Sequence, residues 1–283
     1  MTRPLVDWHS HVWEPEHLGS EWGPQLDAKY PHVPSRCGGH AQHREAMAAA
    51  GVTECIVLSL RSDHLGIDVP NEYVAEYVET WDGRAVGVAS VDPNRASAVD
   101  ELVYASETLG LRGLKLAPPY QDFHPHSDAA FAVYRAAAEH GMFLMFHQGG
   151  VTHRRGVLEV AQPVLLDKVA RELPDTNIII CHFGQPWQHE VVPLLRKHDN
   201  VYTDLSARCA RPAQLAQMLL AARDYNAFDK ILWGSDFPTF DVAEHARQLL
   251  TVAETTDGAI PLAELEDILH NRPLSLLGLG PDA

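Results

Sequence analysis

Two histidines separated by one residue, His9 and His11, close the first apolar run of the chain. If that run is a β-strand, alternate side chains share a face, so both imidazoles point to the same side. Two neighbouring imidazoles supply half the ligands of a typical metal site. A chain with 17 histidines contains about one such pair by chance, and we assign His124 and His126 to chance. The metal site therefore depends on further ligand-type residues at matching places.

Short apolar runs recur along the chain and alternate with segments whose apolar residues follow helical spacing. The runs predicted to be strands are 4–11, 54–60, 85–91, 111–117, 142–147, 177–182, 200–205 and 230–236. The segments predicted to be helices between them are 43–50, 69–80, 96–109, 128–140, 163–173, 186–198 and 212–222, and two more helices are predicted after the last strand, near 242–251 and 262–269. Eight strand–helix repeats of this size predict an α/β fold of the (β/α)8 TIM-barrel type. An open doubly wound sheet is less compatible, because it has fewer strands and the chain lacks a Gly-x-Gly-x-x-Gly motif.

The active site of such a barrel lies at the C-terminal ends of its strands. The ionisable residues at these ends are His9, His11, Lys115, His147, His182 and Asp236. An ionisable group that ends a buried run is costly unless it is paired or bound to a metal. Imidazoles and a carboxylate together suit a divalent cation such as Zn²⁺, which lowers the pKa of water to about 7. The set therefore predicts a metal-dependent enzyme.

The motifs around these residues resemble those of the amidohydrolase superfamily. They are Asp7-Trp-His-Ser-His, Gly113-Leu-Lys-Leu, the strand end at His147, Cys181-His-Phe-Gly, Asn200-Val-Tyr-Thr-Asp-Leu-Ser and Gly234-Ser-Asp-Phe-Pro. Over residues 5–278 the chain is similar to the amidohydrolase family 2 branch, which includes aminocarboxymuconate semialdehyde and resorcylate decarboxylases. The resemblance implies one metal ion, Zn²⁺ in the first instance, held by His9, His11, His147 and Asp236. It also implies that His182 is the catalytic histidine, and Asp236 is expected to transfer protons as well as bind the metal.

Lys115 has two interpretations. In binuclear members of the superfamily a carbamylated lysine on the fourth strand bridges two metal ions, and His147 and His182 would then bind the second ion. In family 2 a single ion is usual, and Lys115 would instead be a cation facing an acidic group of the substrate. A binuclear site and Mn²⁺ therefore stay open as alternatives to a single Zn²⁺.

Arginines follow several of the predicted strands, and Arg61, Arg154 and Arg208 are candidates for substrate binding. A guanidinium group binds a carboxylate through two parallel hydrogen bonds, so these arginines favour a substrate with a carboxylate. The alternative is that they balance neighbouring acidic residues. Trp187 is a candidate for the wall of the site, and Asp204 is expected to have a structural role.

These observations predict a hydrolase that cleaves an ester, lactone or amide bond in a small carboxylate-bearing molecule with metal-activated water. In this reaction Asp236 would carry the proton and His182 would polarise the carbonyl oxygen. The alternative is a metal-dependent, non-oxidative decarboxylase of an aromatic or unsaturated acid that uses the same site. A third hypothesis, a barrel that only binds a ligand, requires a broken site, and none of the expected positions is broken.

Composition argues against several partners. The 38 acidic residues outnumber the 22 basic ones, giving a formal net charge of −16, which disfavours nucleic acid and anionic membranes as partners. The chain contains no long apolar stretch and no signal-peptide pattern, so a cytoplasmic location is expected. The four cysteines lack Cys-x-x-Cys spacing and are expected to be reduced thiols. The expected partner is a small-molecule substrate, and the family resemblance suggests a homodimer.

One barrel domain is predicted over residues 1–283. The segment 14–40 is too long for an ordinary connection and is predicted to be a lid. Residues 262–283 are predicted to form a C-terminal helix and tail.

Overall fold

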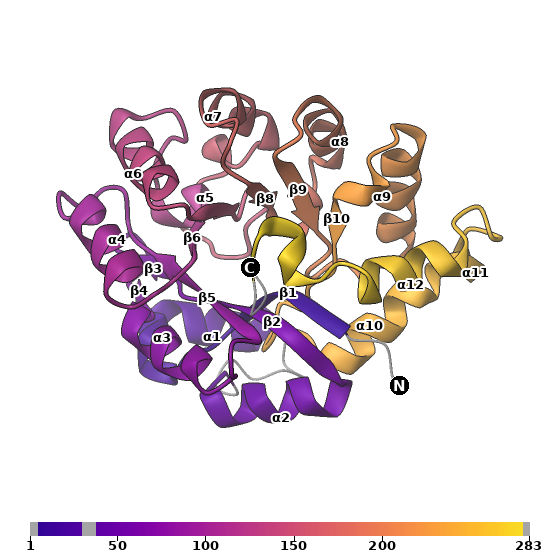
Figure 1. Ribbon diagram of the computed structural model, residues 1–283, viewed down its shortest axis with the longest axis horizontal. Coiled ribbons are helices and arrows are strands. Elements are labelled where there is room, and N and C mark those ends of the chain that lie inside the picture. Colours follow the sequence, from indigo (N-terminus) through magenta and orange to yellow (C-terminus); the bar gives the residue numbers. More distant parts are fainter. Residues whose placement is uncertain (1–4, 30–37, 280–283) are drawn as a thin grey trace.

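The computed structural model describes residues 5–29 and 38–279. Among these residues, eight parallel strands form one sheet whose spatial order follows the sequence (Figure 1). The strands are β1 (Leu5–His11), β2 (Val52–Leu58), β5 (Ala85–Ser90), β6 (Gly113–Leu116), β7 (Phe143–Phe146), β8 (Ile178–Ile180), β9 (Val201–Asp204) and β10 (Ile231–Leu232). This order confirms the predicted (β/α)8 barrel, and each strand lies within or overlaps one of the predicted runs.

Backbone hydrogen bonds between β1 and the segment that follows β10 close the barrel. Trp8 N donates to Trp233 O at 2.9 Å, and Asp236 N donates to His9 O at 2.8 Å. Gly234 lies in this seam, and a Cβ atom there would be 2.6 Å from the Cβ of His9. The glycine of the Gly-Ser-Asp motif is therefore required sterically, because the backbone of this segment must approach His9 closely.

Helices surround the strands (Figure 1). Those that match predicted segments are α2 (His40–Ala50), α3 (Asn71–Glu79), α4 (Ala98–Glu107), α6 (Asp128–Glu139), α7 (Leu166–Glu172), α8 (Gln188–Lys197), α9 (Pro212–Asp224), α10 (Val242–Leu250) and α12 (Leu262–His270). The other helical elements are α1 (Gly19–Lys29), α5 (Pro118–Gln121), α11 (Val252–Thr255), η1 (Pro15–Leu18), η2 (Leu158–Val160), η3 (Pro163–Leu165), η4 (Cys181–Gly184), η5 (Phe228–Lys230) and η6 (Leu274–Leu277). A short antiparallel pair, β3 (Arg61–Ser62) and β4 (Ile67–Asp68), follows β2.

Local signals explain where several helices begin and end. The Ser127 side chain accepts a hydrogen bond from Ala130 N at 3.2 Å, which caps the start of α6. Just after α6, Gly141 has a φ of 66°, a left-handed conformation that glycine adopts without steric cost. Pro212 occupies the first turn of α9, where its missing N–H is not needed.

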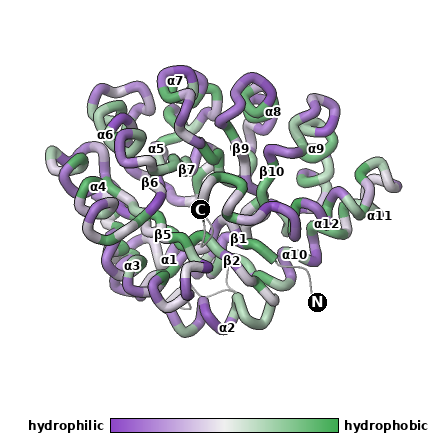
Figure 2. The backbone as a smooth tube through the Cα atoms, in the orientation of Figure 1, coloured by the Kyte–Doolittle hydropathy of each residue, from purple (hydrophilic) through white to green (hydrophobic). Residues whose placement is uncertain are grey.

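The barrel core has an inner and an outer layer. The inner layer fills the barrel and includes Val6, Trp8 and Ile56, and the outer layer lies between strands and helices. Figure 2 shows hydrophobic residues along the strands and hydrophilic ones mainly on the outer helices and loops. Leu274 and Leu279 from the C-terminal segment belong to the inner layer.

The C-terminal segment closes the end of the barrel where the strands begin. The Trp8 indole donates to Arg272 O at 2.8 Å, and Leu274 N donates to a carboxylate oxygen of Glu54 at 3.0 Å. Figure 1 shows the yellow segment that follows α12 near the middle of this end. The predicted C-terminal helix is therefore present as α12, and the segment after it acts as a plug.

The segment 14–40, predicted to be a lid, contains η1, α1 and the start of α2, and its residues 30–37 lie outside the described part of the chain. Gln25 on α1 contacts the His153 ring at 2.9 Å, and Glu21 pairs with Arg154 at 3.2 Å. These contacts hold α1 against the loop that follows β7. Opening and closing of this segment stays a prediction.

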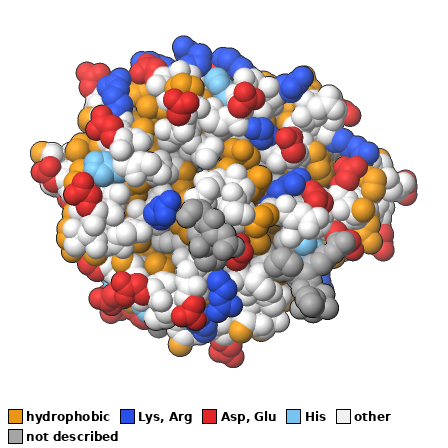
Figure 3. Space-filling model, viewed as in Figure 1, with side chains coloured by type: hydrophobic (Ala, Val, Ile, Leu, Met, Phe, Trp, Pro, Cys, Tyr) orange, Lys and Arg blue, Asp and Glu red, His pale blue; other side chains and the backbone are white. Residues whose placement is uncertain are grey.

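Cys55, Cys181 and Cys209 are buried free thiols, as expected, and Cys37 lies outside the described residues. Acidic and basic side chains are interspersed on the face shown in Figure 3. Within the described ranges, no helix combines the length and the apolar character needed to cross a bilayer.

Candidate active site

A cavity of about 420 Å³ lies at the C-terminal ends of the strands. The predicted ionisable residues that line it are His9, His11, Lys115, His147, His182 and Asp236. They come from five different strand ends, so the closed barrel is what brings them together. The cavity volume suits a small organic molecule.

Three of the predicted ligands converge. The Nε2 atom of His9 lies 3.2 Å from Nε2 of His11 and 3.4 Å from Oδ1 of Asp236. The Nε2 atom of His11 is 3.7 Å from the same oxygen. The two histidines share a face of β1 as predicted, and Asp236 reaches them from the seam because its backbone has a left-handed φ of 63°.

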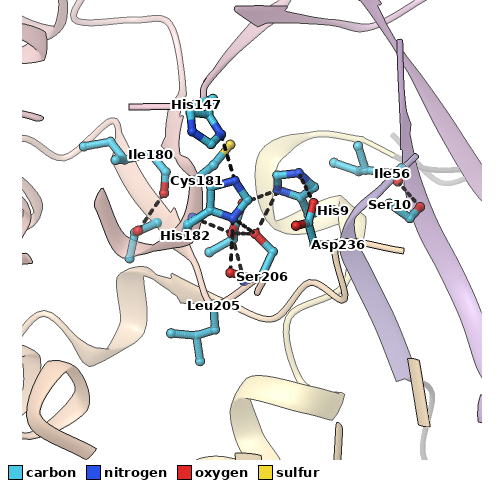
Figure 4. Close-up of polar contacts among 12 residues, drawn as sticks. His9, Ser10, Ile56, His147, Ile180, Cys181, His182, Leu205, Ser206 and Asp236 are labelled. Atoms are coloured by element: carbon cyan, nitrogen blue, oxygen red, sulfur yellow. Dashed lines mark hydrogen bonds and ion pairs between the residues drawn. The ribbon is translucent and has the colours of Figure 1, made fainter. Parts of the chain in front are cut away.

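His182 lies between the rings of His9 and His147 (Figure 4). Its ring centroid is 4.9 Å from that of His9 and 4.8 Å from that of His147. The Nε2 atom of His182 faces Nδ1 of His147 at 3.0 Å, and Nε2 of His147 faces Gly150 O at 3.2 Å. Ligand atoms of His9, His182 and Asp236 all lie within 4.8 Å of one another. The structure therefore places His182 nearer the converging ligands than His147, although His147 was the expected ligand.

Burial keeps the histidines neutral. Desolvation lowers the pKa of His9, His11 and His182 well below the ordinary value. The pKa of His147 falls to about 3 through burial and, secondarily, the Lys115 cation. Neutral imidazole is the form that binds metals.

Burial has the opposite effect on Asp236. Desolvation raises the pKa of its carboxyl group to about 7, and Lys115 opposes this rise. A carboxyl group with a pKa near neutrality can both accept and release a proton at physiological pH. Asp236 thus combines the position of a ligand with the pKa of an acid–base group.

Lys115 lies in β6 and is 2% exposed. Its Nζ donates to the Cys181 sulfur at 3.0 Å. Burial raises the pKa of the Cys181 thiol, so the sulfur stays protonated near neutral pH. Lys115 therefore faces the same cavity as the histidines, with its amino group held by the residue before His182.

The structure separates the candidate substrate residues. Arg208 and Trp187 line the cavity as predicted. Arg61 does not reach it, because it pairs with Asp68 at 2.7 Å and with a glutamate of α4 at 2.6 Å. Arg154 also lies outside the cavity, since its side chain is 73% exposed and pairs with α1. Arg61 and Arg154 thus balance neighbouring acidic residues, which was the alternative to substrate binding.

Sequence reasoning missed several residues in or beside the cavity. Trp22 on α1 lines the cavity and packs edge-on against Tyr120, with ring centroids 4.8 Å apart. Arg211 lines it as well. Ser206 contacts the rings of two site histidines and lies two residues after Asp204, the same spacing that revealed the pair on β1. The spacing of two residues between Asp204 and Ser206, at the end of a predicted strand, was the signal in the sequence that could have identified Ser206.

Comparison with known families identifies a model described as amidohydrolase, which matches residues 6–279. A search of curated protein sequences finds no match. Among solved structures, an uncharacterized TIM-barrel protein of Bordetella bronchiseptica superposes with a TM-score of 0.74 at 20% identity, covering 97% of this chain and 99% of that one.

Two other similar structures carry an activity in their names. One is described as a probable 2-pyrone-4,6-dicarboxylic acid hydrolase of Acinetobacter baumannii with citric acid bound, with a TM-score of 0.67, 16% identity and coverage of 97% and 99%. The other is a dihydroxybenzoic acid decarboxylase of Polaromonas with bound manganese and 2-nitroresorcinol, with a TM-score of 0.69, 15% identity and coverage of 98% and 97%. At these identities the likeness shows the shared barrel fold.

Proposed function

The chain belongs to the amidohydrolase family, in its family 2 branch, and from this premise we propose that it is a metal-dependent hydrolase. Its substrate is a small carboxylate-bearing molecule with an ester, lactone or amide bond. The observation that carries the proposal is the convergence of His9, His11 and Asp236 at one point of a cavity. The histidines and the carboxylate are the ligand types that this chemistry requires.

The three converging atoms fit a divalent cation. Two imidazole nitrogens and a carboxylate oxygen at 3.2–3.7 Å present lone pairs to one another, which is unfavourable without a cation or proton between them. We assign His9, His11 and Asp236 as ligands, with the fourth from the His147–His182 pair. Zn²⁺ suits this set, and the manganese of the Polaromonas decarboxylase makes Mn²⁺ the alternative. When bound, such an ion supplies Lewis acidity and lowers the pKa of water to about 7.

The side chains around this point can move the protons of a hydrolysis. Asp236, whose Oδ1 lies at the converging point, accepts the proton of the attacking water and delivers it to the leaving group. The Nδ1 atom of His182 lies 3.1 Å from the carbonyl oxygen of Ser206, which can only accept a hydrogen bond. A neutral His182 therefore presents Nε2 as a proton acceptor. We therefore propose His182 as the base, which is one of the two roles, base or electrophile, that the sequence leaves open for it.

The walls of the cavity suit a flat acidic molecule. Lys115, Arg208 and Arg211 supply three cationic side chains. The aromatic side chains on the walls are Trp13, Trp22, Tyr120 and Trp187. Guanidinium groups bind carboxylates, and aromatic rings stack on planar groups. The proposed substrate is therefore a ring compound with at least one carboxylate.

The second candidate is a non-oxidative decarboxylase of an aromatic or unsaturated acid. The lining of the cavity favours this alternative as well, because its cationic side chains can hold a carboxylate and its aromatic side chains can stack on a ring. The products distinguish the two reactions. Release of carbon dioxide without net hydrolysis identifies the decarboxylase, and uptake of water with no carbon dioxide identifies the hydrolase.

The test begins with the metal content of protein purified without added metal or chelator. We expect about one zinc or manganese ion per chain, followed by turnover of members of a panel of lactone carboxylates and hydroxybenzoates. Two ions per chain would make Lys115 the carbamylated bridge between them. If no ion is bound and no divalent ion restores activity, the metal-dependent function is wrong.

A further inference from the structure

A second carboxylate, that of Asp204, lies behind the converging ligands. It is completely buried at the end of β9 and touches both His9 and His182. We propose that Asp204 is a positioning residue that fixes which ring nitrogen of His9 carries the proton. The consequence for metal binding rests on the proposed function, whereas the proton position is a property of the metal-free chain.

One oxygen of Asp204 is held by obligatory donors. Its Oδ1 accepts the backbone N–H of His182 at 2.9 Å and that of Ser206 at 3.0 Å. The Ser206 hydroxyl donates to the same oxygen. A backbone N–H can only donate, so this oxygen must act as an acceptor and the orientation of the carboxylate is fixed.

The other oxygen of Asp204 faces the His9 ring. Its Oδ2 lies 2.9 Å from Nδ1 of His9, 195 positions away in the sequence. An ionised carboxylate has only acceptors, so Nδ1 of His9 must carry the hydrogen. Neutral imidazole has a single ring proton, which leaves Nε2 with a free lone pair. This Nε2 is the atom that points to His11 and Asp236, so Asp204 prepares His9 as a ligand.

Ser206 extends the same effect to His182 (Figure 4). Its Oγ lies 2.7 Å from Nδ1 of His182 and 3.0 Å from Nδ1 of His9. Because the hydroxyl proton goes to Asp204, the oxygen accepts from the rings. Both rings thus carry their proton on Nδ1. This leaves Nε2 of His9 toward His11 and Asp236, and Nε2 of His182 toward Nδ1 of His147. Asp204 therefore organises the ligand side and the proton-transfer side of the site together.

The experiment compares metal-free protein labelled with nitrogen-15 histidine. Two-bond nitrogen–hydrogen correlation spectra distinguish protonated from unprotonated ring nitrogens, and a His9→Gln variant assigns the His9 signals. We expect wild-type His9 to carry its proton on Nδ1. In Asp204→Asn the amide oxygen must stay toward the two backbone N–H groups, so the amide NH2 faces His9. The proton of His9 should then move to Nε2.

Two variants serve as controls. Asp7 is equally buried, and its Oδ1 accepts from the His9 backbone N–H at 3.0 Å, but no hydrogen bond joins it to the ring. Asp7→Asn should therefore leave the His9 proton on Nδ1. Ser206→Ala keeps the contact between Asp204 and His9 and should do the same. These variants separate the effect of this carboxylate from that of altering a buried polar group nearby.

Calorimetric titration with Zn²⁺ and Mn²⁺ measures the consequence. Asp204→Asn should weaken binding about 10- to 100-fold, the range typical of partners that orient metal-binding histidines. Asp7→Asn should change it less than about threefold.

A wild-type His9 that carries its proton on Nε2 would overturn the inference without any variant. So would an Asp204→Asn protein that binds metal like the wild type. A third outcome separates the two proposals. If the wild type binds neither ion, but the His9 proton lies on Nδ1 in the wild type and on Nε2 in Asp204→Asn, the inference stands and the proposed function fails.

Discussion

The two ends of the barrel are formed by the same eight strands but by opposite kinds of residue. Where the strands begin, Leu274 and Leu279 pack onto Val6, Trp8 and the other apolar residues of the inner layer. Where they end, the buried residues beside a cavity are His9, His11, His182, Lys115 and Asp204. Apolar burial stabilises the fold, whereas buried ionisable groups lower stability unless they are paired. One end therefore supports the chain and the other carries the chemistry.

Backbone strain follows the same division. Glycine, aspartate and asparagine adopt a positive φ most readily. Of the other described residues, those with a positive φ are His182, Phe183 and Ala207, with φ between 53° and 59°. All three follow β8 or β9 at the cavity end. Such conformations cost on the order of 1–3 kcal/mol each and persist only where the surroundings hold them. The hydrogen bond from His182 N to Asp204 is one such restraint.

The largest expected effect comes from removing the carboxylate at the reactive end. Asp236→Ala should lower kcat by about a thousandfold or more, because one group supplies both a ligand and the proton transfer. The metal-free variant should be no less stable than the wild type, since burial disfavours the ionised carboxylate, as its raised pKa shows. Steady-state rates and urea unfolding measure the two effects. Full activity in this variant would refute the assigned mechanism.

A substitution at the opposite end of the barrel, where the strands begin, should lower the stability of the fold and leave the chemistry unchanged. Leu274 is completely buried, so Leu274→Ala should lower the free energy of unfolding by about 2–5 kcal/mol. Metal content and kcat should be unchanged at a temperature where the variant is folded. Leu276 is 42% exposed in the same 3-10 helix, and Leu276→Ala should cost less than about 0.5 kcal/mol. Equal losses for the two variants would contradict the plug at this end.

Asp7 offers a test through pH. Burial raises the pKa of its carboxyl group from 3.8 to about 7. The folded chain therefore binds this proton more tightly than the unfolded chain, and stability falls as pH rises from about 4 to about 7. This group accounts for up to about 4 kcal/mol of that fall. Asp7→Asn cannot ionise, so its stability relative to wild type should increase over this range.

Urea unfolding of both proteins at several pH values measures this difference. Asp175→Asn, at an exposed position, provides the control for the substitution itself. A difference between Asp7→Asn and wild type that does not change with pH would show that Asp7 ionises normally.

The smallest effect is on KM and compares Arg208 with Arg154, each of which follows a strand of the barrel in the sequence. Arg208 lines the cavity, and Arg208→Ala should raise KM for an acidic substrate about tenfold, or about 1.4 kcal/mol. The exposed Arg154 pairs with Glu21, and Arg154→Ala should change KM less than twofold. Equal changes in KM would place the carboxylate of the substrate outside the cavity described.

The barrel strands were predictable because each is a short apolar run bounded by turn residues. The helix α1 was not, since Gly19 and Pro24 disfavour a helix and its apolar periodicity is weak. In the folded chain, Gln25 and Glu21 of α1 contact the loop after β7. Weak local signals of this kind leave the outcome to long-range packing.

The candidate ligands were predictable for a different reason. An ionisable residue at the end of a buried run is costly, so His147, His182 and Asp236 were conspicuous in the sequence. Arg61 and Arg208 both follow strands and could not be distinguished in this way. Arg61 turns outward to the acidic groups beside it, and Arg208 follows the left-handed Ala207 into the cavity.

The sequence by itself determined the order of strands, the end of the barrel that carries the site and the residue types available there. Those properties depend on local periodicity and on the alternation of side chains along a strand. Only the tertiary structure decided which atoms meet, such as Asp204 with His9 and His182 with His147. These pairs are distant in the chain and rest on backbone angles that no periodic pattern encodes. Closure of the barrel supplies both the proximity and the packing that holds those angles.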